Sequence, residues 1–160
     1  MLIGYHRSHE ASVVAIDDAG RPLHAISEER LSRIKMQGGW PRLAAAWLEG
    51  RIDTRGAQLV HGGLPLVQRL PRELSLALWN ATHGKLQDVH PKRFQKLADV
   101  AFGRARDDGG GVFPNRPRVH VDHHTCHAAS AYYPSGFDEA EVVTVDGVGD
   151  TYSSRFFHAK

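Results

Sequence analysis

The stretch 120-HVDHHTCHAASAYYPSGFDEAEVVTVDGVGD-150 decides how the rest of the chain is interpreted. His123 and His127 are four residues apart, so on a helix their imidazoles lie one above the other and can bind a single ion. His124 would point away from that pair. The small residues at 128–131 favour a slim helix, and Pro-Ser-Gly at 134–136 ends it.

A β-branched run follows this helix. Residues 142–145 read Val-Val-Thr-Val, which predicts a buried strand with Asp146 at its carboxyl end, where α/β folds place their chemistry. Isolated histidines four apart are more often surface or core residues. Together with a carboxylate at a strand end they predict a three-ligand metal site with open positions for substrate.

Two glycines follow the predicted strand, within Asp-Gly-Val-Gly-Asp at 146–150. Gly147 and Gly149 can bring backbone N–H groups against a phosphate, because side chains there would block the approach. A tight hairpin turn explains the same residues equally well.

The run 123–150 resembles the signature of the NodU/CmcH-type O-carbamoyltransferases. The segment 6–35, HRSHEASVVAIDDAGRPLHAISEERLSRIK, is similar to the start of the same family: a His-acid-Ala-Ser turn, a hairpin, and an acidic-acidic-Arg stretch ending in Lys. The two motifs occur in the right order, whereas the segment 51–118 adds little to the resemblance.

The resemblance implies an α/β fold. The amino-terminal domain of that family is related to the universal tRNA threonylcarbamoyladenosine metalloprotein and to the actin, sugar kinase and Hsp70 (ASKHA) fold. Residues 1–140 would then form a ribonuclease H-like half, and 141–160 the first hairpin of an incomplete second half. A two-stranded hairpin without its sheet is marginally stable in water. The chain is therefore expected to be truncated: a fragment, a remnant, or a subunit completed by another chain.

The beginning of the chain predicts three strands, at 2–5, 11–16 and 22–27, joined as a meander. The first turn of a ribonuclease H-like half faces the cleft. The resemblance therefore implies His9 as a catalytic base and Ser12 as a contact of the transferred group; a solvated turn histidine is the alternative for His9.

Charges of both signs crowd the segment 28–35, a pattern typical of a solvated face, including Arg30 and Arg33. The resemblance implies that Lys35 contacts the phosphate-bearing intermediate. A helix is predicted from Pro41 to its stop at Gly50. Trp40 and Trp47 are expected in the core.

Further elements are predicted along the chain: strands at 57–61 and 118–121, helices at 72–79 and 91–105, and a glycine-rich linker at 107–111. His61 ends the first of these strands. The basic residues of helix 91–105 are expected to form a solvated face rather than an RNA interface, because no aromatic stacking platform accompanies them.

Composition limits the classes of function. The 160 residues are 41% hydrophobic with a formal charge of +2, enough for one ordinary core and too little charge to indicate nucleic acid. Cys126 is the single cysteine, either a small buried helix residue or a thiolate ligand. No signal run or apolar span of roughly 20 residues occurs. A cytoplasmic location without membrane contact is expected.

The resemblance also implies a function. In that family a YrdC-like domain makes carbamoyl-adenylate from ATP and carbamoyl phosphate, and the metal-binding domain transfers the carbamoyl group to a hydroxyl of a small acceptor in secondary-metabolite biosynthesis. A divalent metal, Fe(II) by analogy, would be held by His123, His127 and Asp146. The substrate or nucleotide would contact Lys35, His127, Asp146, Gly147 and Gly149.

Relatives supply a further metal carboxylate from later in the chain, and the YrdC-like domain is absent from these residues. The 160 residues alone are therefore expected to be inactive, with the missing parts supplied in cis or in trans. Two alternatives stay open: a non-catalytic ASKHA module, and a metal-dependent hydrolase with His124 or Asp122 as the base.

Overall fold

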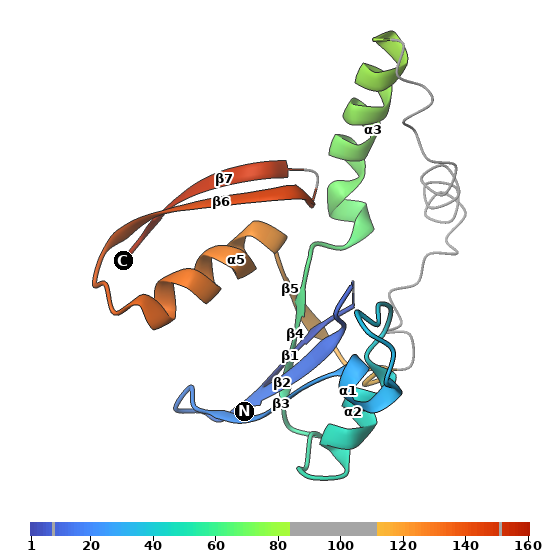
Figure 1. Cartoon of the computed structure of the whole chain (residues 1–160), viewed down its shortest axis with the longest axis vertical. Helices are drawn as coiled ribbons and strands as arrows, with labels where there is room; N and C mark the ends of the chain where they lie inside the picture. Colours follow the sequence, from blue (N-terminus) through green and yellow to red (C-terminus); the bar gives the residue numbers. More distant parts are fainter. Residues whose placement is uncertain (8, 84–111, 151) are drawn as a thin grey trace. The chain divides into compact units, whose positions relative to one another are not determined.

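The computed structural model describes residues 1–7, 9–83, 112–150 and 152–160 (Figure 1). The chain divides into two compact units, Met1–Gly63 with Asp108–Asp122, and Leu64–Asp107 with His123–Lys160. The predicted helix at 91–105 and the linker at 107–111 lie outside the described residues. The expected domain boundary after residue 140 stays a prediction.

The first unit is built on a five-stranded sheet (Figure 1). Its strands are β1 (Leu2–His6), β2 (Ser12–Ile16), β3 (Pro22–Ser27), β4 (Gln58–Gly62) and β5 (Arg118–Val121), in the order β3-β2-β1-β4-β5. The first three strands form an antiparallel meander, and β4 and β5 run parallel to β1. The mixed sheet confirms the α/β class and the predicted meander.

Buried and more exposed side chains alternate along the strands, so one face of this sheet is packed in the core. On β1 the buried side chains are Ile3 and Tyr5, two residues apart, as the period of a strand requires. Helix α2 (Arg42–Glu49) contributes Ala44, Ala45 and Leu48 to the same core. Full burial of a side chain such as Leu48 stabilises the fold by about 1.5–3 kcal/mol. Trp40 and Trp47 pack against this core, as predicted.

Glu28 explains how α2 begins. It opens the short helix α1 (Glu28–Ser32), and its carboxylate accepts the backbone N–H groups of Leu43 (3.1 Å) and Ala44 (2.9 Å). Pro41, the residue before α2, makes no side-chain cap, so the buried carboxylate satisfies these otherwise unpaired donors. Arg30 and Arg33 are exposed as expected of a solvated face, whereas Glu28 departs from that pattern.

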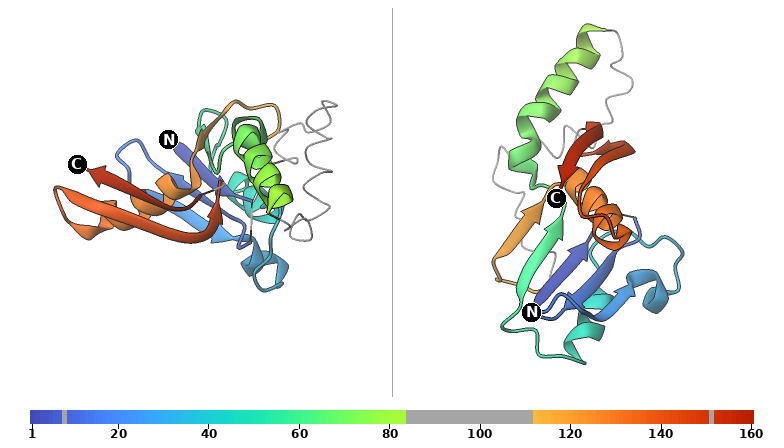
Figure 2. Two further views of the ribbon diagram at one scale, coloured as in Figure 1. Left: turned by 90° about the horizontal axis from the view of Figure 1, so that it is seen from above. Right: turned by 90° about the vertical axis from the view of Figure 1, so that its left-hand side faces the viewer.

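The second unit contains helix α3 (Leu66–Thr82), helix α5 (His123–Tyr132), the 3-10 turn η3 (Tyr133–Ser135) and the hairpin of β6 (Ala140–Gly149) and β7 (Tyr152–Ala159). Helix α5 lies along the hairpin (Figure 2). The predicted histidine helix, its stop and the hairpin are confirmed. The prediction that residues 142–145 form a buried strand is wrong. The two-stranded sheet is covered by α5 on the face that carries Thr144, so Thr144 is buried whereas Val143 and Val145 are exposed. α3 begins at Leu66, six residues before the predicted start at Arg72, and Pro71 lies inside the helix.

The unit boundaries keep α5, β6 and β7 together, so the predicted metal ligands belong to one compact body. Among the described residues, no helix has the length and apolar character that crossing a membrane requires.

Candidate metal centre

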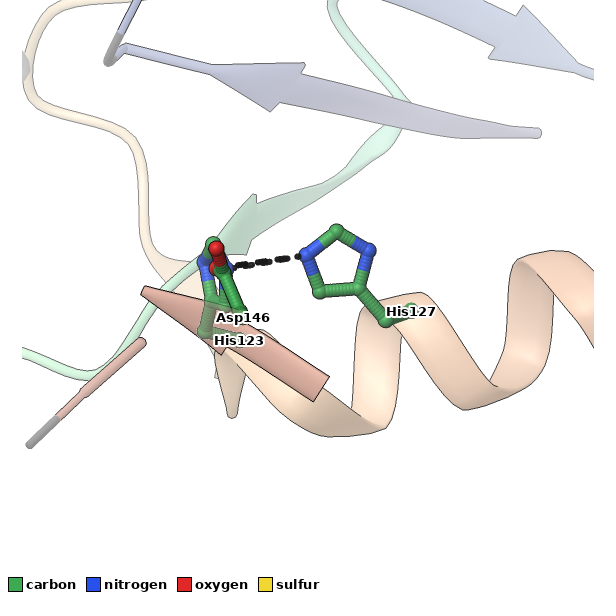
Figure 3. Close-up of side chains that lie close together, drawn as sticks. All are labelled: His123, His127 and Asp146. Carbon is green, nitrogen blue, oxygen red and sulfur yellow. Dashed lines mark hydrogen bonds and ion pairs between the residues drawn. The ribbon is translucent and has the colours of Figure 1, made fainter. Parts of the chain in front are cut away.

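His123, His127 and Asp146 converge as the sequence predicted (Figure 3). His123 Nε2 is 2.7 Å from Asp146 Oδ2, and His127 Nε2 is 3.0 Å from His123 Nε2 and 3.7 Å from Asp146 Oδ2. The histidines come from successive turns of α5, and the aspartate comes from β6. One atom of each side chain can therefore face a common point.

These spacings fit a divalent ion. Ligand atoms about 2.1 Å from an ion and 90° apart lie about 3.0 Å from one another. The observed separations of 2.7, 3.0 and 3.7 Å bracket that value, so small side-chain rotations suffice. Two imidazoles and one carboxylate on one side of an ion leave coordination positions open, and this donor set suits Fe(II).

The charge of Asp146 suits the same role. The hydrogen bond with His123, and next the backbone N–H of Gly147, hold the pKa of the Asp146 carboxyl below its usual range. Gly147 donates to Oδ1 (2.6 Å), whereas Oδ2 faces the histidines. The carboxylate is therefore anionic at neutral pH and directs one oxygen toward the two rings.

Gly149 lies against the ring of His123. A Cβ built at this position would be 2.1 Å from His123 Cδ2 and 2.8 Å from His123 Nε2. At Gly147 a Cβ would meet nothing within 4 Å. The close approach of the His123 ring therefore requires glycine at residue 149, which the sequence alone did not indicate. The predicted contact of Gly149 with a phosphate stays a prediction.

Asp150 fixes the beginning of α5. Its buried carboxylate accepts the backbone N–H of His123 (2.8 Å) and that of Leu64 (2.9 Å). The first N–H groups of a helix have no partner within the helix, so this acceptor stabilises the turn that carries His123. The role of Asp150 was not predicted from the sequence, because the helix that it caps begins 27 residues earlier in the chain.

His124 has a structural role. It is fully buried, with Nδ1 2.8 Å from Thr144 Oγ1 and Nε2 3.0 Å from the carbonyl oxygen of Tyr152. A carbonyl only accepts, so Nε2 carries a proton, and the Thr144 hydroxyl that contacts Nδ1 also donates to the carbonyl oxygen of Arg155 (3.3 Å). His124 is thus neither a ligand of the cluster nor available as the base of a hydrolase.

The remaining predicted site residues lie elsewhere. The His9 side chain is 70% exposed, 3.8 Å from the Glu10 carboxylate, and Lys35 is exposed; both belong to the first unit. Cys126, on α5, is half-buried and is not one of the three clustered residues. The structure brings together the three predicted metal ligands, and their role, like those of His9 and Lys35, stays a prediction.

A protein family and two curated proteins match this chain. The family described as "Carbamoyltransferase N-terminus" matches residues 81–160. The uncharacterised protein sll1178 of Synechocystis sp. is 29% identical, over 93% of this chain and 26% of its own length. The nodulation protein NolNO of Sinorhizobium fredii is 30% identical, over 89% of this chain and 20% of its own length.

The chain thus spans about a quarter or less of these curated relatives. The family match covers half of the chain and includes all three clustered donors, His123, His127 and Asp146. The chain belongs to the carbamoyltransferase N-terminus family, which confirms the NodU/CmcH-type resemblance.

Proposed function

We propose that this chain is the metal-binding amino-terminal part of an O-carbamoyltransferase. The complete protein would transfer a carbamoyl group from carbamoyl-adenylate, made from carbamoyl phosphate and ATP, to the hydroxyl of a small acceptor in secondary-metabolite biosynthesis, in the cytoplasm. The convergence of His123, His127 and Asp146 within the family-matched segment carries this proposal. A YrdC-like domain and the remaining half of the ASKHA domain would be supplied in cis or in trans.

The fold supports the same assignment at a coarser level. The antiparallel meander β1–β3 is the opening expected of a ribonuclease H-like half, and β6–β7 is the hairpin expected to open the second half. We therefore retain the ASKHA fold as part of the proposal.

His123, His127 and Asp146 would hold the ion, Fe(II) by family analogy. When bound, the ion supplies Lewis acidity at an oxygen on which negative charge develops. The Asp146 carboxylate offsets one of its positive charges, and Asp150 and Gly149 fix the backbone and the ring of His123. These contacts orient the donors before any ligand arrives.

His9 and Lys35 would act on the organic reactants. A neutral imidazole at His9 can accept the proton of the acceptor hydroxyl at neutral pH, since the ordinary pKa of histidine is about 6.5. The ammonium of Lys35 would bind the adenylate phosphate. Gly147 and Gly149 would let the backbone approach a phosphate, because neither carries a side chain. The burial of His124, with both ring nitrogens bonded, argues against His124 as the base of the hydrolase alternative, which leaves Asp122 as its other candidate.

Metal titration of the 160-residue chain tests the candidate centre. Co(II) absorption spectra and anaerobic Fe(II) calorimetry should show one site per chain, and His123→Ala or Asp146→Asn should weaken it by about 100-fold or more. His158→Ala is the matched control, because this exposed histidine lies on the same hairpin and pairs with Glu139 and Glu141. Full affinity in the double change His123→Ala, His127→Ala would reject the centre.

Transfer is tested on the complete protein with pre-formed carbamoyl-adenylate, following release of AMP. His9→Ala should lower the transfer rate by about 10²–10⁴-fold with little effect on adenylate binding, because a general base acts on the chemical step. Lys35→Ala should instead weaken use of the adenylate. Neither change should alter metal content. An unchanged rate for His9→Ala would leave this residue an ordinary turn histidine.

A further inference from the structure

A pocket of about 370 Å³ lies in the first unit, away from any residue given a role above. Two chain segments line it: Arg55–Gln58, leading into β4, and Arg116–Val119, leading into β5. Because β4 and β5 are parallel, the pocket is at the amino ends of these strands. α/β folds place their catalytic residues at the opposite, carboxyl ends.

Three arginines line this pocket, and only one of them, Arg55, is paired with a carboxylate. Arg55 forms a two-pronged ion pair with Asp53, with N–O distances of 2.9 and 2.8 Å. The hydrogen bonds from Arg55 lower the pKa of Asp53 to about 2, so this pair is charged and mutually neutralised at physiological pH.

Arg116 and Arg118 are half-buried, and the groups that contact their guanidinium groups are neutral oxygens and the rings of Phe113 and Tyr5. Arg116 donates to the carbonyl oxygen of Ala57, and Arg118 donates to the Tyr5 hydroxyl (2.7 Å). None of the ion pairs within the described part of the chain includes either guanidinium. Partly buried charge is unfavourable without compensation, so an anion in the pocket would stabilise both arginines.

The rest of the lining is apolar. Ala57 is buried, whereas Pro117 and Val119 present exposed aliphatic surface, with Val119 45% exposed. The volume falls at the lower end of the range for small-molecule sites, about 300–1,000 Å³. Apolar walls beside two planar guanidinium forks suit a ligand with an apolar body and one oxyanion group.

We propose that this pocket binds a small organic oxyanion, a carboxylate or a phosphate monoester, through Arg116 and Arg118. The anion would accept hydrogen bonds from guanidinium N–H groups, and its apolar part would lie against Ala57, Pro117 and Val119. The proposal is independent of carbamoyl transfer, since none of these residues belongs to the metal centre or to the predicted substrate contacts.

The binding test uses the ¹⁵N-labelled 160-residue chain with phenyl phosphate, benzoate and the neutral benzyl alcohol as probes. The anions should give saturable amide shifts confined to residues 55–58 and 116–119, weakened by added sodium chloride. Saturation by only one anion would support the site and identify its oxyanion class. No saturable shift, or equal binding of benzyl alcohol, would overturn the proposal.

Two variants separate binding from folding. Arg116→Gln should weaken anion binding by about tenfold or more, whereas Arg30→Gln, an equal charge change at an exposed position of the same unit, should leave it unchanged. Gly56→Leu keeps every arginine and adds a side chain at a lining position where a Cβ meets nothing within 4 Å. It should abolish binding in a folded protein; unchanged affinity in both pocket variants would contradict the proposal.

Discussion

At Gly149 the backbone approaches the ring of His123 so closely that no side chain fits between them. The nearest ring carbon would be 2.1 Å from an added Cβ, well inside van der Waals contact. The ring can yield only by turning, and turning would move Nε2 away from Asp146 and His127. The absence of a side chain at residue 149 therefore helps to set the geometry of the candidate metal centre.

Gly149→Ala should destabilise the chain by about 1–3 kcal/mol, as overpacking of a close contact does, and should also weaken Co(II) binding. Gly147→Ala is the matched control: it makes the same chemical change two residues earlier, where a Cβ meets nothing within 4 Å. Urea denaturation and the Co(II) spectrum report the two effects. Equal behaviour of the two alanine variants would show that the His123 ring is not held by Gly149.

At the scale of elements, one buried histidine joins helix α5 to the β6–β7 hairpin. His124 binds the Thr144 hydroxyl on β6 and the Tyr152 carbonyl on β7, so one ring fixes the helix to both strands. The helix carries His123 and His127, and β6 carries Asp146. The separation of the three donors depends on this attachment as well as on their own side chains.

His124→Ala should therefore lower the free energy of unfolding by about 1–3 kcal/mol, because it leaves buried hydrogen-bonding groups unsatisfied. Metal affinity should fall as well, although His124 is not a ligand. His124→Gln retains a donor and an acceptor and should recover part of both losses. The exposed His158→Ala should stay within about 0.5 kcal/mol of the unchanged protein in urea denaturation. A stable His124→Ala protein with full metal affinity would contradict this account.

The elements predicted correctly are those specified by local pattern. The stop at residues 134–136 predicted the end of α5, and the spacing of His123 and His127 predicted that their imidazoles lie together on one face of it. The Val-Val-Thr-Val run predicted the strand β6 but not its exposure. The start of α3 was predicted six residues too late, since the helix continues before Pro71 although an interior proline disfavours a helix.

The contacts that the sequence did not predict join residues far apart along the chain. Glu28 caps a helix that begins 14 residues later, and Asp150 caps one that begins 27 residues earlier. The packing of Gly149 on His123 likewise depends on where β6 crosses α5. No periodicity or motif encodes these contacts, so the sequence predicts the three clustered residues of the candidate centre but not the groups that orient them.

At the scale of the whole molecule, the residues proposed to bind metal and those proposed to act in carbamoyl transfer belong to different units. Metal binding can be tested on this chain, whereas carbamoyl transfer needs the complete protein. All three metal donors belong to the unit with α5 and the hairpin, so metal binding can be measured on the 160 residues. The predicted base His9 and phosphate contact Lys35 belong to the other unit. Carbamoyl transfer, which would need both, is a test for the longer protein.

The hairpin presents an exposed apolar face whose behaviour also concerns the whole molecule. Val143 pairs with Phe156 and Val145 with Ser154, so these side chains share one face of the two-stranded sheet. Their exposures are large: 81% for Val145, 78% for Phe156 and 54% for Val143. Contiguous apolar surface of this kind promotes association between chains, as do unpaired strand edges.

We expect the 160-residue chain to self-associate as its concentration rises, and Phe156→Lys to shift the equilibrium toward monomer by placing a charge in the middle of the apolar face. Tyr133→Lys is the matched control, because Tyr133 is an aromatic residue of similar exposure, 81%, on η3 of the same unit. Sedimentation velocity over a series of concentrations measures the effect. If Tyr133→Lys lowered association as much as Phe156→Lys did, exposed aromatic residues in general, and not the hairpin face, would explain the association. A chain that stays monomeric at every concentration would contradict the prediction.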